Sequence, residues 1–173
     1  MVLKEPSILV LHGPNLNLLG QRNQEVYGSL TLDELNQKLL SHGKNQKAKL
    51  EFKQSNLEGE LVSIIQDAPT LFEAVVLNPG GFSHTSVAIR DAIESCSIPV
   101  IECHISNIHA REEFRKHSLT AAMCHGIVVG FGALSYHLAL DAALHIVKNP
   151  SGCLLYTSPS PRDATLSRMP SSA

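Results

Sequence analysis

The chain has 173 residues, 43% of them hydrophobic, which is enough for one domain with a substantial core. Its formal net charge of -2 gives no sign of a nucleic-acid-binding or anionic-membrane-binding surface. No apolar run approaches the roughly 18 residues of a membrane span, and residues 1–6 lack the apolar core of a signal peptide. We therefore expect a globular protein with neither a nucleic-acid nor a membrane partner.

The cysteines show no CxxC or other metal-ligand spacing; they are Cys96, Cys103, Cys124 and Cys153. Two of them lie in or beside predicted strands. We interpret them as reduced, mostly buried thiols of a cytoplasmic protein, without a disulfide framework.

Short apolar segments alternate with helical patterns along the chain. The predicted strands are residues 7–11, 50–54, 74–77, 100–104 and 126–130. The predicted helices are residues 32–43, 57–69, 87–93 and 134–148, with a short helical turn at 112–116. A capping box of Thr31 and Glu34 opens the first helix, which we expect to end at Gly43. The alternation predicts a flavodoxin-like three-layer sandwich: a five-stranded parallel sheet in the order 2-1-3-4-5, covered on both faces.

Two parts of different character make up the chain. Residues 1–150 are predicted to form a single catalytic α/β domain. Residues 151–173 are rich in Ser, Pro and Arg and have no periodicity, so they cannot extend the core. This tail resembles translated adapter read-through, and we expect it to be disordered or artefactual.

Residues 78–86, NPGGFSHTS, are predicted to form a turn between a buried strand and a helix. Gly80 and Gly81 allow the backbone to approach a ligand closely. Ser83 or Thr85 could cap the following helix, whose free N–H groups favour an anion. With His84, the stretch suggests a site for a polar, anionic small molecule. A plain helix cap with a surface histidine is the alternative, and this segment alone does not decide between them.

Polar side chains follow four of the predicted strands: Asn15, Asn56, Asn78 and His104. Ligands of open α/β sheets bind beyond the carboxyl ends of the strands, so these side chains predict a hydrogen-bonding, nearly uncharged crevice. Nearby loops add Arg22, Tyr27, Arg111 and Arg115.

Acid–base chemistry is the activity that this crevice suggests. The guanidinium of Arg22 would lower the pKa of Tyr27 from its usual value of about 10 and so produce a phenolate base. The alternative is an ordinary loop tyrosine. His104 could be a general acid oriented by Glu102, which lies on the same face of its strand, or it could be a structural histidine. His84 could bind a substrate oxygen. Six of the remaining histidines are interpreted as surface or packing residues: His12, His42, His117, His125, His137 and His145.

Several enzyme classes are excluded by missing motifs. The chain has no GxSxG elbow, no Walker A loop, no dinucleotide-binding glycine pattern and no HExxH zinc motif. Cofactor-free acid–base chemistry, with no metal, is what remains.

Five segments resemble the successive motifs of one enzyme family. HGPNLNLLG, RNQEVYG, QSNLEGEL, NPGGFSHTSVAIRDA and ECHISNIHAREEFRKHS are similar, in order and spacing, to those of type II 3-dehydroquinate dehydratase. The resemblance runs from about residue 8 to about residue 144. It implies a lyase that dehydrates 3-dehydroquinate to 3-dehydroshikimate without metal or cofactor, in the shikimate pathway or in quinate breakdown.

The resemblance also implies catalytic roles. Tyr27, as phenolate, removes the proton next to the substrate ketone, and Arg22 keeps it ionised. Asn15 holds a water that stabilises the enolate. His104 protonates the departing hydroxyl and is oriented by Glu102.

Substrate contacts and assembly are implied in the same way. Asn78, His84 and Arg115 hold ring hydroxyls, and the backbone N–H groups of Ile105 and Ser106 bind the carboxylate. Members of the family assemble as dodecamers built from trimers, in which Asp91 would reach into a neighbour's site.

Two rival hypotheses stay open. One is a catalytically silent, flavodoxin-like protein that binds a small anion. The other, weaker, is a regulator that depends on a nucleotide or phosphate.

Overall fold

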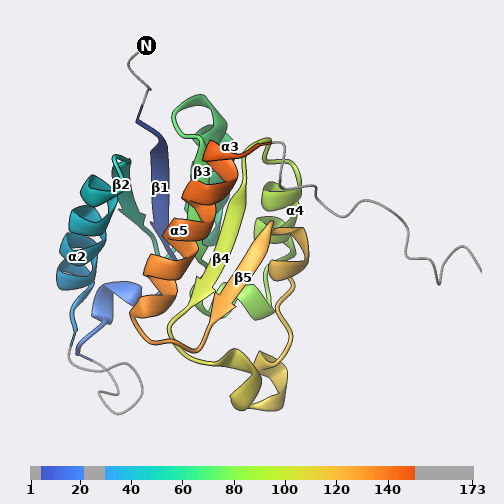
Figure 1. Ribbon diagram of the computed structural model, residues 1–173. Helices are drawn as coiled ribbons and strands as arrows, with labels where there is room; N and C mark the ends of the chain where they lie inside the picture. Colours follow the sequence, from blue (N-terminus) through green and yellow to red (C-terminus); the bar gives the residue numbers. More distant parts are fainter. Residues whose placement is uncertain (1–4, 22–29, 151–173) are drawn as a thin grey trace, which may run out of the picture.

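The computed structural model describes residues 5–21 and 30–150 of the chain. Its centre is a five-stranded, fully parallel sheet in the order β2-β1-β3-β4-β5, which confirms the predicted flavodoxin-like topology (Figure 1). The strands are β1 (Ser7–His12), β2 (Lys49–Gln54), β3 (Ala74–Asn78), β4 (Val100–His104) and β5 (Gly126–Val129). The predicted tail, residues 151–173, lies outside the described residues.

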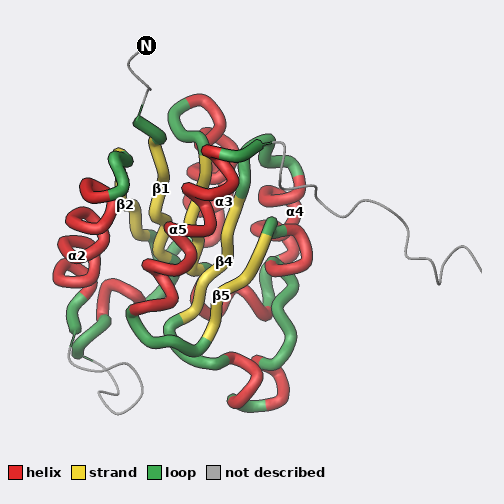
Figure 2. Tube along the Cα trace, viewed as in Figure 1, coloured by secondary structure: helices red, strands yellow, loops and turns green. Residues whose placement is uncertain are grey.

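Helices cover both faces of the sheet and complete three layers (Figure 2). They are α2 (Leu32–Asn45) and α5 (Leu134–Lys148) on one face, and α3 (Glu58–Asp67) and α4 (Val87–Glu94) on the other. Short 3-10 turns lie at Leu16–Leu18, Ala68–Thr70, Gly80–His84, Ile108–Ala110, Glu113–Arg115 and Ala121–Met123. Within the described ranges, no helix is both long enough and apolar enough to cross a membrane.

The two hydrophobic cores follow from the alternation of side chains along each strand. On β1, Ile8 and Val10 pack with the α2/α5 layer, while Leu9 and Leu11 pack with the α3/α4 layer. All four are fully buried. Burial of each such side chain stabilises the fold by about 1.5–3 kcal/mol. Because both faces of β1 are apolar, the strand is held in the middle of the molecule and its carboxyl end is fixed there.

Helix α2 begins where the sequence predicts and ends later. The Thr31 hydroxyl accepts a bond from the Glu34 N–H, and the Glu34 carboxylate accepts one from the Thr31 N–H, so the capping box is confirmed. The prediction that the helix ends at Gly43 is wrong, since α2 continues to Asn45. Gly43 is there for packing: a Cβ at this position would come within 2.8 Å of Leu50 Cδ1 on β2.

The turn between β3 and α4 also differs from its prediction. Neither Ser83 nor Thr85 caps α4; the Ser86 hydroxyl does, accepting from the Ile89 N–H at 2.8 Å. A 3-10 turn over Gly80–His84 lies between the strand and the helix, and α4 begins at Val87, as the sequence pattern predicted. The Ser83 hydroxyl is used inside this turn, where it donates to the Gly80 carbonyl at 2.9 Å.

Candidate active site

A cavity of about 620 Å³ opens at the carboxyl ends of β1, β3 and β4. Its lining residues are Pro14, Asn15, Leu16, Leu18, Leu19, Asn78, Gly80, Gly81, His84, His104, Ile105, Ser106, Ile108, Arg111 and Arg115. This is the edge at which open α/β sheets bind ligands. The cavity is the candidate active site.

Three of the four predicted strand-end residues line the cavity, and the fourth supports one of them. Asn15 has a left-handed backbone with φ of 65°, which asparagine tolerates better than most residues. Its N–H donates to the Asn56 Oδ1 at 2.8 Å. Asn56, after β2, therefore holds the turn that presents Asn15, while Asn78 and His104 reach the cavity directly.

The turns after β1 and β3 are pressed together at the floor of the cavity. The Gly13 N–H donates to the Asn78 carbonyl at 2.7 Å, and a Cβ on Gly13 would lie only 2.6 Å from the Pro79 carbonyl carbon. Gly80 has φ of +57°, a conformation that favours glycine. Gly81 has open space around its Cβ position. Of the two glycines singled out in the sequence, Gly80 is needed for the turn and Gly81 leaves room beside the backbone.

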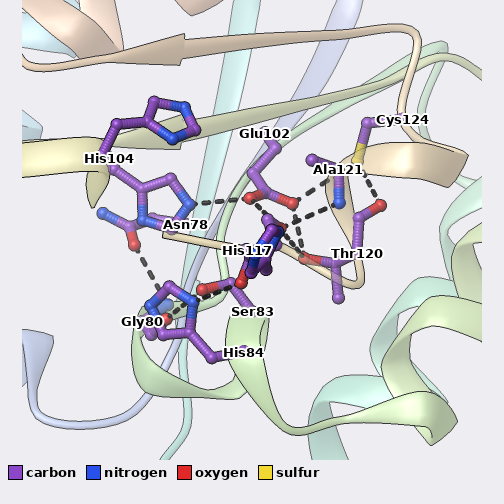
Figure 3. A network of polar contacts seen from close by, with 12 residues as sticks. Asn78, Gly80, Ser83, His84, Glu102, His104, His117, Thr120, Ala121 and Cys124 are labelled. Carbon is purple, nitrogen blue, oxygen red and sulfur yellow. Dashed lines mark hydrogen bonds and ion pairs between the residues drawn. The ribbon is translucent and has the colours of Figure 1, made fainter. Parts of the chain in front are cut away.

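His104 and Glu102 form a buried pair on β4. The His104 Nε2 lies 2.7 Å from Glu102 Oε1, as expected for residues two apart on one face of a strand (Figure 3). Glu102 is fully buried, and His104 is 6% exposed where it lines the cavity. Since Nε2–H donates to the carboxylate, the other ring nitrogen, Nδ1, is left to exchange a proton with a bound molecule.

Further donors hold the Glu102 carboxylate in place. The Ser118 hydroxyl donates to Oε1 at 2.8 Å, and the Thr120 hydroxyl donates to Oε2 at 2.5 Å. The Cys124 thiol lies 3.8 Å from the same Oε2 (Figure 3). Burial, and then the charge of Glu102, raise the pKa of Cys124, so its sulfur keeps its proton. A buried carboxylate with this many donors is compensated without a metal or a second charge.

Sequence reasoning missed Ser118 and Thr120. They lie 16 and 18 residues after Glu102, in the connection that leads to β5. The family motif quoted in the sequence ends at Ser118 but gave it no role, and no motif includes Thr120; only the folded connection brings both hydroxyls to the carboxylate.

His84 is fixed by the same connection. Its Nδ1–H donates to the His117 carbonyl at 2.8 Å, which leaves Nε2 for a ligand in the cavity. The Leu119 N–H donates to the Ser83 carbonyl at 2.7 Å and ties the two segments together. His84 is thus held in one orientation on the cavity wall, where its Nε2 can donate or accept a hydrogen bond.

Two guanidinium groups bring positive charge to the cavity. The Arg115 Nε lies 3.1 Å from the Glu112 carboxylate. An Arg111 N–H donates to the Ser106 hydroxyl at 3.4 Å. Both arginines line the cavity, and their charge favours an anionic ligand there.

The structure brings most of the sequence-predicted site residues together. Those that line the cavity are Asn15, Asn78, Gly80, Gly81, His84, His104, Ile105, Ser106 and Arg115, with Glu102 directly behind His104. Asp91 is on α4 outside this lining, and its carboxylate accepts from Arg90 at 2.9 Å. Arg22 and Tyr27 lie outside the described residues. Among residues 5–21 and 30–150, no three His, Cys, Asp or Glu side chains are grouped as metal ligands would be.

Comparisons with known proteins agree with one another. A family model described as dehydroquinase class II matches residues 6–144. A 3-dehydroquinate dehydratase of Acaryochloris marina is 52% identical over 143 residues, which cover 83% of this chain and 96% of that protein. One of Helicobacter hepaticus is 53% identical over 140 residues, covering 80% and 89%. The crystal structure of a type II dehydroquinase from Butyrivibrio crossotus aligns with a TM-score of 0.79 at 42% identity, covering 80% of this chain and 97% of that one.

Proposed function

Because the chain belongs to the class II dehydroquinase family, we propose that it is a lyase that dehydrates 3-dehydroquinate to 3-dehydroshikimate. The observation that carries this proposal is the convergence of a buried histidine–carboxylate pair, two asparagines and two arginines on one cavity. These groups can transfer a proton and hold a polyhydroxylated anion.

In this proposal the elimination is a trans loss of water through an enolate. Tyr27, as its phenolate, removes the proton next to the ketone, and the guanidinium of Arg22 keeps the phenolate ionised. A water held by Asn15 stabilises the enolate oxygen. His104 gives its proton to the departing hydroxyl group, and Glu102 keeps the imidazole oriented. The hydroxyl leaves as water with the proton from His104, and the proton taken up by Tyr27 returns to His104 before the next turnover, so these steps use no metal and no cofactor.

The remaining cavity groups bind substrate. Asn78, His84 and Arg115 hold the ring hydroxyls, and the N–H groups of Ile105 and Ser106 bind the carboxylate. The approach of Arg111 and Arg115 to the cavity supports an anionic substrate. Gly80 and Gly81 line the cavity, and Gly81, with open space at its Cβ position, leaves room for the ring beside the backbone.

We propose a homo-oligomer, a dodecamer built from trimers, in which Asp91 reaches a neighbouring subunit's site. Large apolar side chains that a monomer would leave in water support this: Ile127 at 42%, Phe131 at 60%, Leu134 at 53% and Leu138 at 38% exposed. All four belong to β5 or to the chain leading into and along α5. Burying them against other copies would stabilise an assembly.

The cytoplasm is the compartment that we propose, since the cysteines of the described residues, Cys96, Cys103 and Cys124, are all free. There the enzyme would serve the synthesis of aromatic amino acids through the shikimate pathway, or the breakdown of quinate.

The test is the ultraviolet absorbance of the conjugated enone product after 3-dehydroquinate is added to purified protein. We expect the absorbance to rise steadily with the wild-type chain and kcat to fall by roughly 10²–10⁴-fold with Tyr27→Phe, which keeps the ring but cannot form a base. KM should change little in that variant. No absorbance change with folded wild-type protein would instead favour a silent anion-binding protein.

A further inference from the structure

The β5 turn, residues 130–133, connects β5 to α5 and is not used in the proposed reaction. Because β5 is the neighbour of β4 in the sheet, this turn meets the loop that follows β4 (Figure 1). The Gly130 N–H donates to the His104 carbonyl at 3.3 Å, and the Gly132 N–H donates to the Ile105 carbonyl at 2.9 Å. His104 and Ile105 both line the cavity. The β5 turn therefore holds the backbone of two cavity-lining residues.

These two hydrogen bonds fix two successive peptide planes of the loop after β4. A planar trans peptide holds its C=O and its N–H pointing in opposite directions. With the His104 carbonyl directed at Gly130, the Ile105 N–H points away from β5, toward the β3 side of the sheet, where the cavity opens. With the Ile105 carbonyl directed at Gly132, the Ser106 N–H likewise points away from the β5 turn. The turn thus sets the direction of both N–H groups that are proposed to bind the substrate carboxylate.

The shape of the β5 turn depends on glycine at two positions. Gly130 has φ of +91° and Gly132 has φ of +61°, a region that L side chains rarely adopt. A Cβ on Gly130 would also lie only 3.1 Å from the Asn107 Cβ, in the loop after β4. Among the described residues, no atom beyond its chain neighbours lies within 4 Å of the Cβ position of Gly132, so backbone conformation alone favours glycine there. The two glycines let the turn approach the loop closely enough to bind both carbonyls.

A buried hydroxyl on α5 holds the same turn. Ser135 is fully buried, and its side-chain oxygen accepts from the Phe131 N–H at 3.1 Å. Its backbone N–H donates to the Gly132 carbonyl at 3.1 Å. The N–H groups of residues 130, 131 and 132 thus each have an acceptor, and two of these acceptors belong to cavity-lining residues. The turn is therefore fixed both to the loop after β4 and to the start of α5.

We propose that Gly130, Gly132 and Ser135 are positioning residues that aim the N–H groups of Ile105 and Ser106 at the substrate carboxylate. A backbone N–H has no rotamers of its own, so its value as a ligand for a carboxylate depends on the direction in which its peptide is held. The proposal rests on the proposed function, in which these two N–H groups bind the carboxylate. It adds the β5 turn as the element that determines selectivity for that group.

The main test compares a ligand that has the carboxylate with one that lacks its charge. Gly130→Ala should raise KM for 3-dehydroquinate by roughly tenfold, the scale of one misplaced hydrogen bond to a charged group, with kcat within about threefold of wild type. In calorimetric titrations, the affinity for quinate should fall by about the same factor, and the affinity for methyl quinate, an uncharged ester, by less than about threefold. Equal losses for acid and ester would indicate general damage to the cavity and would overturn the proposal.

Matched variants separate the conformation of the turn from the effect of an added methyl group. Gly126→Ala places the same methyl at the start of β5, where φ is not positive and the space is open, so KM should stay near the wild-type value. Gly132→Asn should keep KM closer to wild type than Gly132→Ala does, because asparagine tolerates the left-handed region better than alanine. Asn and Ala variants with the same KM would contradict a role for the conformation of the turn.

Ser135→Ala tests the turn while leaving both glycines in place, and it serves if Gly130→Ala does not fold. It should raise KM by about threefold, since it removes one hydrogen bond within the turn. Crystal structures add a readout that does not depend on activity. The Ile105–Ser106 peptide should rotate in Gly132→Ala and keep its direction in Gly126→Ala; an unmoved peptide in Gly132→Ala would overturn the proposal. A folded wild type that does not dehydrate 3-dehydroquinate would contradict the proposed function, and the crystal structures would still decide whether the turn sets the peptides.

Discussion

Two histidines end two parallel strands of the same sheet, and they have opposite surroundings. His12 ends β1, is fully buried and contacts only neutral side chains, Asn36 and Tyr136, through its nitrogens. His104 ends β4, lines the cavity and binds the Glu102 carboxylate. A histidine at a strand end is therefore not a functional signal by itself. Its partner and its access to the cavity decide whether it can exchange protons.

The difference originates in which face of the sheet each ring occupies. His12 shares its face of β1 with Ile8 and Val10, which pack in the α2/α5 core, so its partners come from helices. His104 shares its face of β4 with Glu102, two residues earlier, so its partner is built into its own strand. The alternation of side chains between the two faces of a strand thus gives a neutral, structural imidazole at the end of β1 and a carboxylate-bound imidazole at the end of β4.

The largest effect that we expect comes from His104. His104→Asn should lower kcat for 3-dehydroquinate by roughly 10²–10⁴-fold, since the general acid is lost, with little change in the free energy of unfolding. His12→Asn is the matched variant on the other strand, and it should leave kcat within about tenfold of wild type. Steady-state absorbance kinetics compare the two. Similar losses of kcat at both positions would contradict the conclusion that His104 exchanges protons with substrate and His12 does not.

The next effect concerns stability in acid and should be specific to His12. Its pKa in the folded protein is about 4 against an ordinary value of 6.5, so between these pH values the unfolded chain binds more protons than the folded one. The contribution of His12 to the free energy of unfolding is therefore fully present above about pH 6.5. Up to about 3 kcal/mol of it is lost as the pH falls toward 4.

Urea unfolding at pH 7, 5.5 and 4.5 measures this loss. His12→Asn, which cannot be protonated, should give a flatter dependence of the free energy of unfolding on pH than wild type. Other groups titrate in the same range in both proteins, so the difference between the two curves isolates His12. Parallel curves would show that His12 is not held neutral by burial.

The smallest effect should come from the donors around Glu102. Thr120→Val keeps the shape of the side chain but removes the hydroxyl that donates to the Glu102 carboxylate. We expect it to lower the free energy of unfolding by about 1–2 kcal/mol. The kcat should fall several-fold, because a less constrained carboxylate orients His104 less well. Thr120→Ser restores the hydroxyl and should recover most of kcat; a Ser variant as slow as the Val variant would point to packing instead.

The sheet order and the strand-end residues could be predicted because their signals are local. Apolar runs identify the strands, and parallel strands carry the residues that follow them to one edge, which is why Asn15, Asn78 and His104 meet. The capping box at Thr31 is likewise complete within four residues. Those features need no knowledge of distant contacts.

What could not be predicted depends on contacts between distant segments. Ser118 and Thr120 reach Glu102 only after the chain returns from β4, and Tyr136 meets His12 across 124 residues of sequence. The predicted end of α2 was wrong because Gly43 is needed for close packing against Leu50 on β2 and does not terminate its helix.

The thiol beside Glu102 has a consequence for reactivity. Electrophiles and oxidants attack the thiolate, and burial together with the adjacent carboxylate raises the pKa of Cys124. The Cys124 sulfur, 3.8 Å from Glu102 Oε2, is therefore protected by the same charge that orients the imidazole. A covalent inhibitor directed at this cysteine would react slowly with the native protein. Oxidative damage should reach Cys96 more readily, because burial raises its pKa without the added effect of a carboxylate.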